Sequence, residues 1–283
     1  MTPLMVAAVQ GQTAIARLLL AAGAQVAVTD EDGATALMRA ASANRGEMVR
    51  LLIASGAGVN AKSTGGMTAL AAAAYGGYSD IVRVLLTNKA DANLKDNQGR
   101  TPLMAAVTNG DVAAVQALLA AGADVSAVDA GGGGAITYAS ATGAGDVIEL
   151  LETRGAKPAG LDLMLAAEGC HTAAASALIA GGVSPNVDVN GSLPLLTAAG
   201  GNCVETVTLL LARGANVNAK DNDGWTALIK AASANMADVA RVLLAHGADM
   251  DVADTLDRTA SMYAAMAGHE EIAALFKEAR AKK

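Results

Sequence analysis

Aromatic residues are almost missing from this chain: they make up 2% of its 283 residues, with one Trp, one Phe and four Tyr. Hydrophobic residues nevertheless reach 53%, so the apolar mass is mostly alanine and leucine. Residues of this kind favour helices that pack closely together. We therefore expect a core of closely packed helices and not one assembled around large rings.

Clustered positive charge is missing as well. The formal net charge is −7, and Lys and Arg are dense only in the tail KEARAKK at 277–283. Phosphate binding requires such clusters, so we expect no nucleic-acid partner. No apolar run reaches the roughly 18–20 residues that a membrane span needs, and no secretory signal pattern opens the chain. The expected protein is soluble, either cytoplasmic or periplasmic, with no membrane partner.

Recognisable catalytic and metal-binding patterns are lacking too. The chain has no Gly-x-Ser-x-Gly, phosphate-loop or His-Glu-x-x-His pattern. Cys170, His171 and Cys203 are only weak metal-ligand candidates, because a structural zinc site needs four converging ligands and no CxxC is present. We expect no metal, no cofactor and no enzymatic activity. Two cysteines cannot make a disulfide framework, and they leave the redox compartment open.

What the chain does contain is a repeat of about 33 residues, most regular in "GRTPLMAAVTNG" at 99–110. Thr101 suits a helix N-cap, Pro102 suits the first helical position, and Gly122 can close a second helix in the left-handed conformation. Carboxylates recur in the linkers, where we expect them to form turns and not catalytic pairs. The positions equivalent to Thr101 are Thr2, Thr35, Thr68, Gly134, Leu161, Leu193, Thr226 and Thr259.

Segments such as "TPLMAAVTNG", "LLLARGANVNAKDNDGWTALIKAA" and "VLLAHGADMD" give the chain its resemblance to the ankyrin repeat, with its "G-x-TPLH-x-AA" and "GADVN" patterns. The resemblance covers essentially all of the chain. It implies an all-α solenoid of about nine stacked helix-turn-helix repeats with short β-turn loops, forming a single domain over 1–283. Alanine-rich arrays of this kind are common in bacteria, which we take as the expected source.

Several repeats depart from the family pattern. Methionine often replaces the family's histidine, and we expect it to fill that space by apolar packing; a methionine-lined ligand track is the alternative. Repeat five begins in GGGG at 131–134, and the shortened linker at 156–160 leads to Leu161 where a capping threonine is usual. This irregularity is interpreted as a drifted repeat, the alternative being a notch that bends the array or admits a partner side chain. Lys89 replaces a closing glycine and predicts a left-handed residue at some cost.

The two ends of the repeat array also differ in character. The last repeat carries "EEIAALFKEARAKK", a polar face expected of a C-terminal cap. The first repeat has no such face, although stacks need polar ends for solubility. We therefore expect that the natural chain continues upstream of Met1, with self-association through the uncapped N-terminal repeat as the alternative.

The family resemblance implies a non-catalytic protein–protein interaction module or scaffold, which binds another protein on its concave face through loop tips and first helices. Trp, Tyr and Arg are enriched at binding hot spots. For Trp225 the alternative is that its ring packs on the adjacent loop. The acidic linkers predict a partner with a basic or mixed surface. A second hypothesis is a ligand- or metal-binding accessory domain of a larger protein, with a site near repeats five and six. The candidate partner-binding residues are Met67, Tyr75, Arg100, Asn109, Trp225, Arg258 and Met266.

Overall fold

The computed structural model describes residues 1–281, and its regular elements in that range are all α-helices. The chain forms two compact units that change over in repeat five. The first comprises Met1–Tyr138 with Thr153–Ala156, and the second comprises Ala139–Glu152 with the chain from Lys157 onward. Helix α9 (Ala135–Thr142) crosses from one unit to the other, and α10 spans Gly145–Thr153. The predicted all-helical repeat fold is confirmed.

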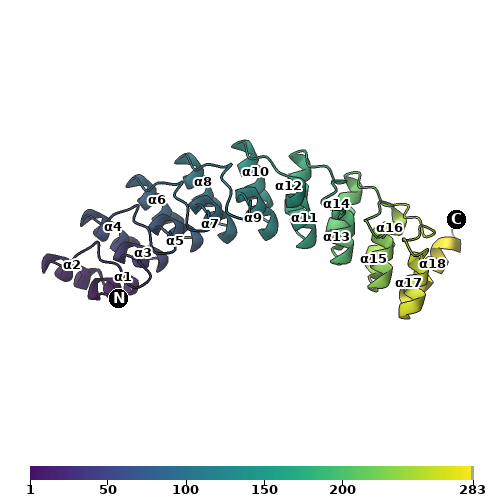
Figure 1. Ribbon diagram of the computed structural model, residues 1–283, viewed down its shortest axis with the longest axis horizontal. Helices are drawn as coiled ribbons and strands as arrows, with labels where there is room; N and C mark the ends of the chain where they lie inside the picture. The colour runs from purple at the N-terminus through teal and green to yellow at the C-terminus, as the bar shows by residue number, and fades with distance from the viewer. Residues whose placement is uncertain (282–283) are drawn as a thin grey trace. The chain divides into compact units, whose positions relative to one another are not determined.

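The first unit stacks its helices in two layers. The first helices of successive repeats contact one another in one layer, and the second helices do so in the other. Figure 1 shows the helices in pairs, one pair to each repeat. The helices of this unit are α1 (Pro3–Gln10), α2 (Thr13–Ala21), α3 (Ala36–Ser42), α4 (Gly46–Ala54), α5 (Ala69–Tyr75), α6 (Ser79–Thr87), α7 (Pro102–Asn109) and α8 (Val112–Ala120).

The second unit repeats this arrangement, with α11, α13, α15 and α17 in one layer and α12, α14, α16 and α18 in the other. Its last helix is longer than the others and buries only Ile272 and Phe276, which agrees with the expected polar end. The helices are α11 (Gly160–Glu168), α12 (Thr172–Ala180), α13 (Pro194–Gly200), α14 (Val204–Ala212), α15 (Ala227–Ser233), α16 (Ala237–Ala245), α17 (Ala260–Ala267) and α18 (Glu270–Ala281).

A threonine caps the first helix of most repeats, as the sequence predicts. Thr101 has an extended backbone, and its hydroxyl accepts a hydrogen bond from the Met104 backbone N–H at 3.4 Å. This bond satisfies one of the amide groups that a helix start leaves without a partner. The Met104 sulfur in turn accepts from the Thr101 N–H at 3.4 Å, so the thioether acts as the second acceptor of a capping box. Thr2, Thr35, Thr68 and Thr226 make the same hydroxyl contact.

The methionine that replaces the family's histidine is mostly a core residue. Met5 and Met104 are each 1% exposed, and Met38 is 5% exposed. These side chains fill the space between the first helices of neighbouring repeats, which contact one another closely. In these repeats the packing interpretation is therefore confirmed, although Met262 in the last repeat is exposed.

The start of repeat six differs from the expectation. Leu161 is not the N-cap of its helix, because α11 begins at Gly160 and Ala159 is the N-cap. Leu161 therefore lies within the first turn and is 52% exposed. The Asp162 carboxylate closes this turn by accepting from the Ala159 backbone N–H at 2.7 Å. This carboxylate has the role that the Met104 sulfur has in repeat four, whereas the bond that a threonine hydroxyl would accept from inside the helix has no counterpart at Ala159.

Linkers of neighbouring repeats are joined by backbone and asparagine hydrogen bonds. The Asn97 N–H donates to the Gly65 carbonyl at 3.1 Å, and the Ala130 N–H donates to the Gln98 carbonyl at 2.8 Å. The asparagine of the "GADVN" pattern spans a repeat in a similar way. Asn93 accepts from the Asp124 N–H and donates to the Gly122 carbonyl. Stacking at a fixed spacing therefore satisfies the polar groups of otherwise exposed loops.

Candidate partner-binding surface

The linker aspartate that precedes each capping position organises the loop tip. In repeat four, one oxygen of Asp96 accepts from the backbone N–H groups of Gln98 and Arg100, both at 2.9 Å. Asp221 and Asp254 close their loops in the same way. The expected turn-forming role is confirmed for these residues. The loop so formed presents the residue just before the cap, which in repeat four is Arg100.

In repeats two, five and nine, the second oxygen of the linker aspartate is bound by a side chain of the first helix nine residues later. Arg39 binds Asp30 at 2.7 Å, and Tyr138 donates its hydroxyl to Asp129 at 2.6 Å. Tyr263 donates to Asp254 in the same way. Sequence reasoning missed these helix residues. Their spacing of nine residues from the linker aspartate was the signal that could have identified them.

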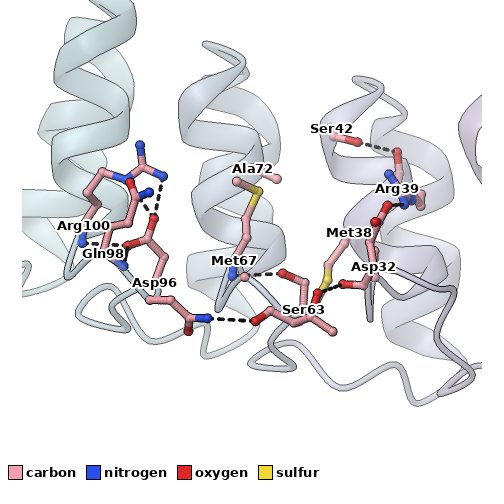
Figure 2. Close-up of a pocket in the computed structure, with 14 residues that line it drawn as sticks. Asp32, Met38, Arg39, Ser42, Ser63, Met67, Ala72, Asp96, Gln98 and Arg100 are labelled. Carbon is pink, nitrogen blue, oxygen red and sulfur yellow. Dashed lines mark hydrogen bonds and ion pairs between the residues drawn. The ribbon is translucent and has the colours of Figure 1, made fainter.

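Small residues on the first helix of repeat three leave a groove between its neighbours. Repeat three has Ala72 at the position where repeat two has Arg39, as Figure 2 shows. A cavity of about 470 Å³ lies here, with Met67 in its wall and Arg39 and Arg100 on opposite sides. The groove is thus a consequence of Ala72 and Ala105 in the place where repeat two has Arg39 and repeat five has Tyr138.

A second cavity of about 430 Å³ continues the groove toward repeat five. It shares Met67, Asp96 and Arg100 with the first cavity and adds Tyr75 and Tyr138. We refer to the two cavities together as the groove. Met67 is 40% exposed and Tyr75 is 62% exposed, so both apolar surfaces are available to a partner.

The charges along the groove are already paired. Arg39 Nη2 lies 2.7 Å from Asp30 and 2.7 Å from Asp32, and Arg100 lies 2.8 Å from Asp96. The hydrogen bond from Arg39 is the main reason why the pKa of Asp30 lies below its usual value. Asp32 keeps 78% of its side chain exposed. Three carboxylates against two guanidinium groups leave this surface slightly acidic.

Three of the four candidates in the first unit therefore line the groove: Met67, Tyr75 and Arg100. Asn109 does not line it. Its side-chain amide donates to the Tyr75 carbonyl at 3.1 Å, and its oxygen lies against the space beside Gly77. Asn109 thus holds the turn of repeat three against that of repeat four.

The candidates of the second unit gather around a residue that the sequence did not single out. The rings of Trp225 and Tyr263 lie 4.9 Å apart at 54°. Arg258 lies over the Tyr263 ring, with its guanidinium carbon 4.8 Å from the ring centroid. Tyr263 thus connects Trp225 and Arg258 into one surface, and Trp225 packs on a helix residue of the next repeat. Met266 is 72% exposed on the same helix, α17.

The buried Asp254 carboxylate holds Tyr263 and Arg258 of this second surface by hydrogen bonds. Burial opposes its ionisation, but hydrogen bonds from Tyr263 and from the backbone of Arg258 and Leu256 outweigh burial and lower its pKa to about 2. The Asp254 side chain is only 1% exposed, whereas that of Arg258 is 33% exposed. The carboxylate therefore fixes the positions of the tyrosine and the arginine and is itself hidden from a partner.

The weak metal-ligand candidates are engaged in other contacts. Cys170 and Cys203 form a disulfide. Nε2 of His171 lies 3.0 Å from the Ala141 carbonyl oxygen. Within residues 1–281 the structure contains no group of three or more His, Cys, Asp or Glu side chains placed to hold a metal ion. Neither sulfur is therefore free to act as a ligand in this oxidised form.

Sequence comparison places the chain in a known family. The model for ankyrin repeats (3 copies) matches residues 1–63, 55–129, 136–221 and 213–283. The chain therefore belongs to the ankyrin-repeat family, whose members generally serve as protein-interaction modules and typically do not catalyse reactions. Among curated proteins, none matches the chain. No helix within the described residues is both long enough and apolar enough to span a membrane.

Proposed function

We propose that this protein is a non-catalytic interaction module or scaffold, and that the groove of repeats two to five binds a segment of another protein. The observation that carries this proposal is the pairing of exposed Met67 and Tyr75 with a floor of small residues, including Ala71, Ala72 and Ala105. Such a surface offers a pocket for an apolar side chain without first having to become ordered.

The charge of the groove indicates the chemistry of the partner. Arg39 and Arg100 already have carboxylate partners, so they offer little to an anion. Asp32 is 78% exposed and extends from the rim. The chain as a whole has a net charge of −7, which favours encounter with a positively charged protein. The proposed partner therefore presents an apolar side chain next to Lys or Arg.

The surface around Trp225, Tyr263 and Arg258 is the second part of the proposal. Trp225 retains partial exposure, and Lys230 Nζ lies 5.8 Å from its ring centroid. Aromatic rings held in place by neighbours lose little conformational entropy on binding, which is why such residues act as anchors. A partner long enough to reach both units would gain affinity from two contacts.

Site-specific photo-cross-linking in the source cells tests the groove directly. A photoreactive residue at Tyr75 faces the groove, and one at Arg83 on α6 serves as the matched control because Arg83 is also exposed. The expected cross-link forms from position 75 and not from position 83. The cross-linked partner is then purified, and its dissociation constant is measured with Tyr75→Ala, Trp225→Ala and Arg83→Ala.

The first two variants are expected to weaken binding about 10-fold or more, the range of hot-spot residues, while the third leaves binding unchanged. Equal cross-linking of the partner from position 83 would refute these sites. A dissociation constant that stays unchanged in both Tyr75→Ala and Trp225→Ala would refute them as well.

The N-terminal repeat carries a further proposed contact, with a second copy of the chain. Helix α2 buries only Ala16, whereas Ile15 is 45% exposed and Leu18 is 72% exposed. Exposed apolar side chains that adjoin on one helix favour association. Light scattering of the whole chain against Leu18→Glu measures this contact. A larger mass for the unsubstituted chain, reduced by the variant, is expected; equal monomer masses contradict it.

A further inference from the structure

The disulfide joins repeats six and seven at two particular positions. Cys170 lies in the turn between α11 and α12, and Cys203 is the N-cap residue of α14. Their Cα atoms are 5.0 Å apart, although the residues are separated by 33 positions in the sequence. Cys203 directly follows Asn202, the residue of repeat seven equivalent to Cys170, so stacking of the two repeats is what brings the sulfur atoms together.

The backbone at Cys170 is one that cysteine rarely adopts. Its φ is 57°, in the left-handed region. Side chains other than Gly, Asn and Asp adopt this region at a cost of about 1–2 kcal/mol. Every other repeat has Gly or Asn at the equivalent turn position. These residues are Gly11, Asn44, Gly77, Gly110, Gly143, Asn202, Asn235 and Gly268. Local backbone preference therefore gives no reason for a cysteine here, whereas its bond to the next repeat does.

The two joined repeats also lack the usual helix cap. The N-cap residues of α11 and α13 are Ala159 and Leu193, and neither makes a side-chain capping hydrogen bond. Repeats in a stack are stabilised mainly by their own helices and by their immediate neighbours. A covalent link between two repeats with weakened helix starts therefore stabilises a part of the stack that has lost local stabilisation.

The surroundings of the two cysteines allow both the disulfide and the two thiols to form. Cys170 is exposed, so a reagent can reach its sulfur, whereas Cys203 is 4% exposed. The Cys203 sulfur lies 3.5 Å from the Ala167 carbonyl oxygen, and the Cys170 sulfur lies 3.8 Å from the Gly201 carbonyl oxygen. After reduction, each thiol would have a carbonyl to which it can donate.

We infer that Cys170 and Cys203 form a thiol–disulfide exchange site whose oxidation state sets the stability of repeats six and seven. A thiolate of an external dithiol attacks the exposed Cys170 sulfur. Cys203 leaves with the electron pair of the broken S–S bond and takes up a proton. The second thiol of the reagent then attacks the mixed disulfide and releases Cys170, which is also protonated. The dithiol thus supplies two electrons and two protons, and a disulfide oxidant reverses the sequence.

Alkylation, thermal unfolding and hydrogen exchange of the full chain test this inference. The chain is first treated with oxidised glutathione or with dithiothreitol, freed of the reagent, and then unfolded in urea and alkylated with iodoacetamide. The matched control is Cys170→Asn with Cys203→Ala, because asparagine suits the left-handed position and Ala144 occupies the place of Cys203 in repeat five. Hydrogen exchange then identifies which helices are affected by reduction.

The oxidised chain is expected to resist alkylation, and the reduced chain is expected to take up two alkyl groups. Reduction should lower the midpoint of unfolding by about 5–15 °C, with faster exchange in α11–α14. The control variant should show no response to dithiothreitol. Free thiols after glutathione treatment, an unchanged midpoint and exchange after reduction, or an equal response of the control variant would each overturn the inference.

Discussion

Replacement of Thr226 by valine isolates the contribution of one helix cap. Thr226 is 2% exposed, and its hydroxyl accepts from the Ile229 backbone N–H at 3.2 Å. Valine has nearly the same shape, so Thr226→Val removes the acceptor and leaves no cavity. The amide group then has no partner and no access to water. Loss of a cap costs about 0.5–2 kcal/mol, and an unsatisfied buried donor costs about 1–3 kcal/mol. These two figures describe the same lost bond, so we expect a loss of about 1–2 kcal/mol.

Thr259→Val provides a matched control one repeat later. Thr259 occupies the same N-cap position, but its hydroxyl caps no helix N–H and instead lies 3.0 Å from the Ser261 hydroxyl. The identical chemical change should therefore cost less than about 0.5 kcal/mol, as is usual for substitutions away from buried polar contacts.

Urea unfolding followed by the fluorescence of Trp225, the only tryptophan, measures both variants close to the substituted sites. Circular dichroism of the whole chain shows whether the loss stays local. Equal costs for Thr226→Val and Thr259→Val would refute the assignment of the effect to the capping bond. So would a loss at Thr226 below about 0.3 kcal/mol, since that is under the smallest cost measured for caps.

Two further predictions concern single residues. Lys89→Gly should raise the free energy of unfolding by about 1 kcal/mol, because Lys89 is exposed with φ 65° and glycine adopts this conformation freely. Urea unfolding measures this change, and a variant less stable than the unsubstituted chain would contradict the prediction. The pKa of Asp254 is lowered to about 2 from an ordinary 3.8, so its contribution to stability is complete above pH 3.8 and is lost as the pH falls toward 2. Tyr263→Phe removes a hydrogen bond from the ionised carboxylate and should raise that pKa, which an NMR titration of Asp254 measures; an unchanged pKa would show that the tyrosine does not stabilise the charge.

The helix starts were the most predictable part of the fold. Thr101 and Pro102 act on backbone groups within three residues of themselves, so their effect can be inferred from the order of residues alone. The exception was repeat six. There the expected cap, Leu161, lies inside the helix, because Asp162 closes the turn from a different position. A carboxylate that accepts from the N-cap N–H was not recognisable from the repeat alignment, because it lies two positions earlier than Met104 does in its repeat.

The surfaces for binding were predictable only in part. The positions of Met67, Tyr75 and Arg100 followed from the repeat register, and the structure places all three along the groove. Asn109 has the same kind of register position but is engaged with the Tyr75 carbonyl. Tyr263 was missed because the repeat pattern marks the loop tip, whereas the ring belongs to a helix. The expected single domain over 1–283 stays a prediction.

The sequence by itself determined the period, the helical class and the helix starts at capping threonines, because each depends on hydrogen bonds and turn preferences among residues close in the chain. Only the tertiary structure decided that Cys170 bonds to Cys203, that Trp225 packs on Tyr263, and that alanines in repeat three leave a groove. These features depend on side chains from different repeats, roughly one repeat or more apart in the sequence. Their meeting depends on how far apart the helices stack and on which side chains are too small to fill the space between them.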